Sequence, residues 1–315
     1  MTPSVHVLGY GALGQEIVRQ LLASGRTVTV LQRSRPASLP HGVAFAAVDS
    51  LDAAALAAAL RPARLVICAL GFPYRKKLWQ HAWPKAMTNL LEACAGSGAR
   101  LVFADNLYLY GPHDGPLTEA LPTVDYGVKP RARAEVTRLW QRAHAEGRVQ
   151  VAAVRAPDFY GPGVTQSVLG EGSIMALAQG KTALLMGDAD LLHDVAHVRD
   201  YARAVISLID APDEAFGQAW HVPCDQTLTL RQHLAIAAAA LNVPLRLIVL
   251  PRWSAPLLGL AVPVVQEGIE MHFLFDRPYR VDARKFRAHF WSDVTPLSEG
   301  LAETALAFRD RPRSG

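Results

Sequence analysis

Hydrophobic and polar positions in the first half of the chain alternate between two patterns. Short apolar runs of strand length occur at 5–8, 27–32, 43–48, 64–69, 100–104 and 150–155, and a loop is expected over 158–163. Segments with apolar residues at helical spacing predict helices over 15–24, 53–60, 77–95 and 130–146. This alternation is typical of an α/β protein, and we predict a Rossmann-type, doubly wound parallel sheet.

The pattern becomes less regular after about residue 165, where shorter elements, prolines and loops follow. We predict a nucleotide-binding domain over 1–165, with elements that return to it near 190–225, and a smaller substrate-binding lobe over 166–315. The apolar stretch 245–265 is interrupted by two arginines and three prolines. These interruptions predict a packed or lid-like segment and not a membrane span.

A glycine-rich turn with the spacing GxGxxG directly follows the first strand. In such a turn Gly9 permits the sharp bend, Gly11 lets the backbone approach a pyrophosphate, and Gly14 lets the next helix pack against the strand. The alternative is a plain structural turn. We predict a dinucleotide site whose contacting residues are Gly9, Tyr10, Gly11, Ala12, Leu13 and Gly14.

The residues after the second strand indicate which dinucleotide binds. NAD-binding sheets usually carry Asp or Glu there, whereas NADP binders place Arg near the 2′-phosphate. This chain has Arg33, Ser34 and Arg35 and no acid. Solvated loop arginines are the alternative, but the missing acid and the two bases both favour NADP(H), with NAD as the weaker choice.

Composition excludes several classes of protein. The chain has 315 residues and a hydrophobic content of 50%, so it can bury a large core. Its net charge of +4 is small. Its arginines are scattered and do not alternate with aromatic residues, so we expect no nucleic acid partner. An anionic cofactor is reason enough for a basic cleft. The expected partner is a small-molecule substrate, and a homodimer is an open possibility.

Three cysteines, Cys68, Cys94 and Cys224, lack CxxC spacing and predict neither a disulfide framework nor a metal site. Free thiols fit a reducing compartment, so we expect a cytoplasmic protein. The N-terminus has no basic leader and no cleavage site, so we also expect no signal peptide and no membrane association.

Several segments carry a joint signal: the glycine turn, Asp49 and the runs 101–111, 155–163 and 193–200. Together they resemble the extended short-chain dehydrogenase/reductase superfamily, in the NAD(P)-dependent epimerase/dehydratase branch that includes atypical members. The resemblance implies a cofactor domain, a substrate lobe and catalysis in the cleft between them. It also implies that Asp49 binds the adenine amino group and that the turn of Ala69, Leu70 and Gly71 lines the nicotinamide ribose.

Departures from the family pattern concern the catalytic residues. Asn106 occupies the position of the catalytic Ser or Thr. In the YxxxK pair, Lys129 has Asp125 four residues ahead, and Tyr126 lies only three ahead. Since Gly127 and Pro130 predict a helix that begins near 130, Tyr126 is expected in a loop. Lys129 remains the candidate for the cofactor ribose and the active site, and Tyr126 a candidate proton donor; the alternatives are a solvated lysine and a packing tyrosine.

Other polar groups lie at the sheet edge where ligands bind in open α/β folds. Asp105 and Asn106 are predicted to line the pocket as further catalytic candidates, and Asn106 can only orient a carbonyl. His193 stands where nucleotide-sugar epimerases of the family have an arginine for the diphosphate, which disfavours such a substrate. The candidate substrate-binding residues are Tyr108, Asp158, Tyr160 and His193.

The combined prediction is an NADP(H)-dependent oxidoreductase that acts on a small, partly apolar carbonyl or alcohol. Two alternatives remain. A redox-neutral epimerase or dehydratase would use the same bound cofactor without consuming it. A non-catalytic NADP-binding sensor is consistent with the missing Ser and Tyr.

Overall fold

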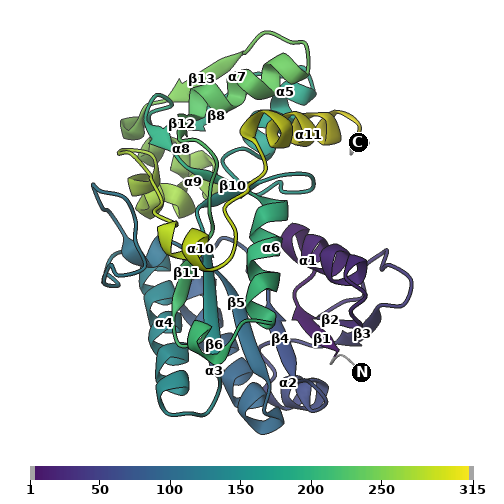
Figure 1. Cartoon of the computed structure of the whole chain (residues 1–315). Helices are drawn as coiled ribbons and strands as arrows, with labels where there is room; N and C mark the ends of the chain where they lie inside the picture. Colours follow the sequence, from purple (N-terminus) through teal and green to yellow (C-terminus); the bar gives the residue numbers. More distant parts are fainter. Residues whose placement is uncertain (1–3, 312–315) are drawn as a thin grey trace. The chain divides into compact units, whose positions relative to one another are not determined.

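The computed structural model describes residues 4–311 and divides into two compact units (Figure 1). Of the described residues, the first unit holds 4–111 together with Pro122–Arg155 and Ala202–Trp220. The second holds Pro112–Leu121, Ala156–Tyr201 and 221–311. The assignment of cofactor and substrate to separate parts of the chain stays a prediction.

A seven-stranded parallel sheet forms the centre of the first unit, which confirms the predicted doubly wound α/β fold. The spatial order is β11-β6-β5-β4-β1-β2-β3, so the order reverses between β1 and β4. Open α/β sheets bind ligands at such a switch point, outside the carboxyl ends of the strands. The strands are β1 (Val5–Leu8), β2 (Val28–Gln32), β3 (Ala44–Ala47), β4 (Leu65–Cys68), β5 (Arg100–Asn106), β6 (Val151–Ala156) and β11 (Ala219–His221).

Helices cover both faces of this sheet. On one face, alternate strand residues such as Leu8, Leu31 and Phe103 form one buried cluster with apolar residues of α2, α3 and α4. On the other, α1 and α6 are neighbours, and Arg26 after α1 donates to Asp210 after α6 (Figure 1). The helices are α1 (Ala12–Ala23), α2 (Ala53–Leu60), α3 (Lys76–Ser97), α4 (Lys129–Ala145) and α6 (Val198–Ile209), with short η1 (Tyr108–Tyr110) and η3 (Asp213–Ala215).

The starts of α1 and α4 differ from the sequence prediction for local reasons, and α3 begins one residue early, at Lys76. Helix α1 begins at Ala12, three residues early, because the amide of Gln15 already donates to the carbonyl of Gly11 at 2.8 Å. The second half of the glycine turn is therefore the first turn of the helix. Helix α4 begins at Lys129, since Pro130 lacks only an N–H that a first turn leaves unpaired.

Three two-stranded sheets and a helical core make up the second unit. The run 158–163 was expected to be a loop, and this is wrong at its start, where β7 pairs with β10. Buried residues of α7 and α11, such as Leu234 and Leu301, pack together. The strands are β7 (Asp158–Tyr160), β8 (Ala183–Met186), β9 (Leu192–His193), β10 (Val195–His197), β12 (Leu228–Thr229) and β13 (Leu247–Leu250), with η2 (Glu171–Met175), α5 (Ala176–Ala178), α7 (Leu230–Ala240), α10 (Arg284–His289) and α11 (Leu297–Arg309).

The stretch 245–265 is packed only in part. Strand β13 pairs with β8, as a packed segment should. In contrast, Trp253 is 73% exposed and Leu260 is 86% exposed. The elements that follow β13 are η4 (Arg252–Ser254), α8 (Ala255–Ala261), α9 (Pro263–Gly268) and η5 (Ile269–Leu274). Within 4–311, no helix has both the length and the apolar character needed to cross a membrane.

Candidate active site

The glycine turn lies at the switch point of the sheet. The amide of Gly9 donates to the carbonyl of Leu31 at 2.9 Å, and the amide of Ala69 donates to the carbonyl of Leu8 at 2.8 Å. The turn is thus held between the carboxyl ends of β2 and β4. This arrangement brings the glycine turn, Arg33–Arg35 and the turn Ala69–Gly71 to one edge of the first unit.

The three glycine positions of the turn differ in what an added side chain would meet. Gly9 has φ +101°, and a Cβ there would clash with the carbonyl of Ala69. A Cβ at Gly14 would clash with the carbonyl of Gly9. Gly11, however, has φ −74°, and a Cβ there would meet nothing within 4 Å. The protein itself does not require a glycine at 11, so the open space above it fits a pyrophosphate beside the first N–H groups of α1.

The residues that follow β2 form an exposed basic loop. Arg33, Ser34 and Arg35 are all exposed. The guanidinium of Arg35 lies 5.4 Å from the ring centroid of Phe45, and the amide side chain of Gln32 donates to the carbonyl of Ser34. Among residues 4–311, neither arginine pairs with a carboxylate. Both guanidinium groups are therefore available to a phosphate.

Asp49 follows β3 at the same edge and is half-buried. Its Oδ1 accepts a hydrogen bond from the amide of Leu51 at 2.9 Å, which fixes the carboxylate in a short turn ahead of α2. A fixed acceptor at this place is compatible with the adenine contact that the family resemblance implies.

Lys129 is fully buried, which rules out a solvated lysine. Its Nζ lies 4.2 Å from the centroid of the Tyr74 ring. Tyr74 contacts Trp79 edge to face at 5.3 Å, and Trp79 stacks on Tyr108 at 6.2 Å between ring centroids. The ammonium group thus lies against Tyr74, which belongs to an aromatic cluster from the loop after β4, from α3 and from η1.

Tyr126 precedes α4, as the sequence predicted. Its side chain is 38% exposed. Asp125, which stands four residues before Lys129, is strongly exposed and pairs with Arg131 on the first turn of the helix. The position of the family's tyrosine therefore holds a surface carboxylate.

Asp105 lies on β5 in a buried ionic cluster. Its carboxylate accepts hydrogen bonds from Arg133 of α4 and from Arg155 of β6, with Nε to oxygen distances of 3.0 and 3.1 Å. Arg155 also donates to the hydroxyl groups of Tyr110 and Thr137. Burial alone lowers the pKa of Arg155, but Asp105 and Tyr110 raise it, and the net direction is upward. The cluster therefore holds two cations and one anion away from solvent.

Asn106 and Tyr108 follow directly at the end of β5. The Oδ1 of Asn106 accepts a hydrogen bond from the amide of Tyr108 at 3.1 Å, and this bond starts the turn η1. Asn106 is half-buried, whereas its neighbour Asp105 is only 3% exposed. Of the predicted pair, Asn106 is therefore the residue with access to solvent at the sheet edge.

Sequence reasoning missed Tyr74, Trp79 and Arg133. A signal was present, because Trp79 and Trp83 are four residues apart on one helix and Lys129 and Arg133 are four apart on another. In the structure α3 packs on α4, and the guanidinium of Arg133 lies 4.1 Å from the Trp83 ring centroid. Matched aromatic and cationic pairs at helical spacing indicate such a contact.

Asp158 and His193, two predicted substrate residues, come together in the second unit. The Nε2 of His193 lies 3.0 Å from Oδ2 of Asp158. The imidazole is 2% exposed and stacks on Phe275 at 5.5 Å, with Tyr279 at 5.0 Å. Within 4–311 no group of three His, Cys, Asp or Glu side chains is placed to hold a metal ion.

Tyr160, the third predicted substrate residue in this unit, is fully buried. Its ring packs edge to face on His197 at 5.1 Å. Burial and the nearby carboxylate of Asp200 raise the pKa of Tyr160 well above its ordinary value. A phenol with so little access to solvent keeps its proton and serves packing in this structure.

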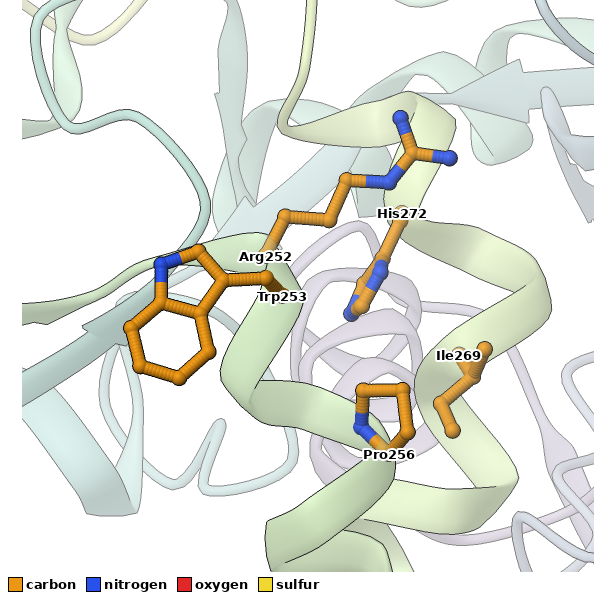
Figure 2. A pocket seen from close by; sticks show the side chains of 5 residues that line it. All are labelled: Arg252, Trp253, Pro256, Ile269 and His272. Carbon is orange, nitrogen blue, oxygen red and sulfur yellow. The ribbon is translucent and has the colours of Figure 1, made fainter.

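The second unit also contains an open pocket of about 560 Å³. Its lining side chains come from η4, α8 and η5 (Figure 2). Arg252 pairs with Asp276 at 2.9 Å, and burial lowers the pKa of His272. The pocket is lined by Arg252, Trp253, Pro256, Ile269 and His272.

Comparison with known proteins places this arrangement in a family. Residues 5–222 match the NAD dependent epimerase/dehydratase family, and the chain belongs to it. It is therefore an enzyme. The chain is also 28% identical to the mouse (Mus musculus) sterol-4-alpha-carboxylate 3-dehydrogenase, decarboxylating, over 87% of this chain and 79% of that protein.

Solved structures share the fold at low sequence identity. A Thermus thermophilus UDP-glucose 4-epimerase in complex with NAD has a TM-score of 0.78 and 22% identity, over 98% of this chain and 99% of that one. The dTDP-glucose 4,6-dehydratase DesIV of Streptomyces venezuelae, with NAD and TYD bound, has a TM-score of 0.79 and 20% identity, over 98% and 97%. Both structures are complexes with NAD.

Proposed function

We propose that this enzyme is an NADP(H)-dependent oxidoreductase that acts on a small, partly apolar carbonyl or alcohol. The observation that carries the proposal is the loop after β2, where Arg33 and Arg35 are exposed without a carboxylate partner among residues 4–311 and no acid is present to bind a ribose 2′-hydroxyl. A 2′-phosphate satisfies both guanidinium groups, whereas NAD leaves them in solvent.

The remaining contacts of the dinucleotide follow from the edge of the sheet. The open face of Gly11 and the first turn of α1 hold the pyrophosphate, and Asp49 lies near the adenine. The turn Ala69–Gly71 lines the nicotinamide ribose, and Lys129, which has no exposed surface, stands behind this part of the site as a buried positive charge. The nicotinamide, when bound, supplies or accepts a hydride.

Residues near the reacting end take separate roles in this proposal. Asn106 orients the substrate carbonyl, because its amide group donates and accepts hydrogen bonds but exchanges no proton. Asp105 is a positioning residue: its carboxylate is engaged by Arg133 and Arg155, so it fixes the end of β5 on which Asn106 stands. Tyr108 borders the same place.

Two observations support a partly apolar substrate in preference to a nucleotide sugar. His193 stands where nucleotide-sugar epimerases have arginine, and its ring is buried and bonded to Asp158, so it is a poor partner for a diphosphate. In addition, the mouse relative is, by name, a dehydrogenase of a sterol carboxylate. An oxidation of a largely apolar alcohol is the corresponding chemistry.

Calorimetry with NADPH and NADH tests the cofactor, and a panel of carbonyl and alcohol substrates followed by NADPH absorbance tests the reaction. We expect NADPH to bind at least about tenfold more tightly, a difference of about 1.4 kcal/mol. Equal or reversed affinities would remove the argument from Arg33 and Arg35, and the NAD complexes of the solved relatives give that outcome weight.

A redox-neutral epimerase or dehydratase is the second candidate, because the family and the solved relatives include such enzymes. Its signature is a tightly retained dinucleotide with substrate conversion but no net change in NADPH. Dinucleotide binding without conversion of any substrate would instead support a sensor.

A further inference from the structure

The family's proton-donating tyrosine is missing from its usual place. Asp125 stands there, exposed to solvent and paired with Arg131. An oxidoreductase still needs a group that exchanges a proton with the substrate oxygen. We propose that Tyr74, on the loop after β4, is this catalytic acid and base and forms a pair with Lys129; the inference rests on the proposed function.

The first argument is the contact between the two side chains. The Nζ of Lys129 lies 4.2 Å from the centroid of the Tyr74 ring, and Lys129 is fully buried. A cation over a phenol ring in a poorly hydrated place stabilises the phenolate by Coulomb attraction, and water screens this attraction little. In the family's YxxxK pair, the lysine stabilises the phenolate of a tyrosine four residues ahead of it. In this chain Lys129 lies against Tyr74, a tyrosine from another element.

The second argument is the position of Tyr74 in the chain and the contacts that hold it there. It follows the turn Ala69–Gly71 in the loop between β4 and α3. The indole Nε1 of Trp79 donates to the carbonyls of Phe72 and Pro73 at 3.4 and 3.1 Å, so α3 holds the loop in place. Trp79 also packs edge to face on the Tyr74 ring. The phenol is therefore fixed and half-buried, as a preorganised proton donor needs to be.

Two other tyrosines are the natural rivals. Tyr126 is 38% exposed and precedes α4, so solvent screens any charge near it. Tyr108 stacks on the indole of Trp79, which orders its ring against α3. Both serve as controls, because replacing either tyrosine with Phe removes a rival phenol and leaves Tyr74 in place.

The proposed step conserves protons and electrons. In the reductive direction a hydride, with two electrons, reaches the carbonyl carbon from the reduced nicotinamide, while the hydroxyl proton of Tyr74 goes to the carbonyl oxygen. The products are the alcohol, the oxidised dinucleotide and a Tyr74 phenolate beside the Lys129 ammonium. The phenolate then takes a proton from water, and oxidation of an alcohol runs the same sequence backwards.

A substrate-free measurement tests the pair. Phenolate formation is followed by ultraviolet difference absorbance during an alkaline titration of the full chain, with and without NADP+. We expect one tyrosine of the wild-type protein to ionise at least about one pH unit lower than it does in Lys129→Met, because the ammonium favours the phenolate. Bound NADP+ should enlarge this shift. Tyr74→Phe should abolish the early step, whereas Tyr108→Phe and Tyr126→Phe should retain it.

The outcomes separate this inference from the proposed function. An early step that survives in Tyr74→Phe, or that disappears in Tyr108→Phe or Tyr126→Phe, overturns the assignment, as does a titration that Lys129→Met leaves unchanged. Failure of calorimetry to detect NADP(H) overturns the proposed function instead, and the titration without NADP+ still decides on the pair. Because Tyr74→Phe keeps the ring over Lys129, circular dichroism should show an unchanged fold.

Discussion

Two pairs of arginines in the first unit differ in burial and in pairing with carboxylates. Arg133 and Arg155 are buried, lie within hydrogen-bond distance of Asp105 and face the rings of Trp83 and Tyr110. Arg33 and Arg35, in contrast, are exposed after β2 and pair with no carboxylate among residues 4–311. The same side chain therefore has a structural role in one place, whereas in the other we propose that it binds a ligand.

The contrast follows from the cost of removing a charge from water. A buried guanidinium is tolerated only when an anion and further acceptors replace its hydration. An exposed guanidinium group is solvated by water and needs no protein partner, so it can pair with a ligand instead. Pairing and burial, more than residue type, separate the arginines that hold the first unit together from those that we propose bind the cofactor.

The largest expected effect comes from breaking the buried cluster. Asp105→Asn leaves two buried guanidinium groups without a counter-charge, and we expect it to lower the free energy of unfolding by about 3–5 kcal/mol. Denaturant titration measures this loss. The matched control is Asp213→Asn, which removes an exposed partner of Arg100 and should cost less than about 1 kcal/mol. Equal losses in the two variants would contradict the contrast.

A second variant separates ligand space from packing space. Gly11→Val places a branched side chain where nothing in the protein lies within 4 Å, so the fold should survive. The pyrophosphate would meet this side chain, and calorimetry should show NADPH affinity reduced at least about 100-fold, or about 2.7 kcal/mol. Gly96→Val, on the exposed surface of α3, should bind as wild type does. Unchanged affinity in Gly11→Val would place the dinucleotide elsewhere.

The third prediction concerns His233, a buried basic side chain that, unlike Arg133 and Arg155, is not paired with Asp105. Burial, helped by the nearby imidazole of His193, lowers the pKa of His233 to about 3. The unfolded chain therefore binds more protons below about pH 6.5, and the stability that the neutral ring contributes is lost as pH falls from about 6.5 towards 3. Between about pH 7 and 5 this amounts to about 2 kcal/mol.

Denaturant titrations at both pH values check this loss. His233→Gln carries no titrating ring, so its stability should fall less on acidification than that of wild type, by about 2 kcal/mol. An identical pH dependence in the two proteins would show that His233 does not stay neutral in the folded state.

The smallest expected effect concerns the exposed pair. Arg33→Asp replaces a cation with an anion near the proposed 2′-phosphate, and the preference for NADPH over NADH should fall at least about tenfold, or about 1.4 kcal/mol. Arg61→Asp changes the net charge equally but lies directly after α2, in the connection to β4. That control should leave the preference unchanged. A loss of preference in both variants would indicate long-range charge and not a local contact.

Much of the first unit was predictable from local sequence patterns. Apolar runs of strand length and helical spacing identified β1 to β6 and their helices within a few residues, because burial on a parallel sheet leaves a continuous apolar signature. The glycine turn and the basic loop at Arg33 and Arg35 were readable for a similar reason, since each is a short segment whose residues act as neighbours in the chain. Element boundaries depended on single hydrogen bonds, as at Gly11.

The amino-acid sequence by itself determined the parallel sheet and the glycine turn. It also showed that the family's usual tyrosine is missing four residues before Lys129. Only the tertiary structure decided that Asp105 is enclosed by Arg133 and Arg155 and that Tyr74 covers Lys129. These partners are 28, 50 and 55 residues apart in the chain. Asp105 and Arg155 meet because β5 and β6 are neighbouring strands, whereas Arg133 and Lys129 come from α4, which packs on α3. Contacts of that kind arise from packing between elements, and no local pattern encodes them.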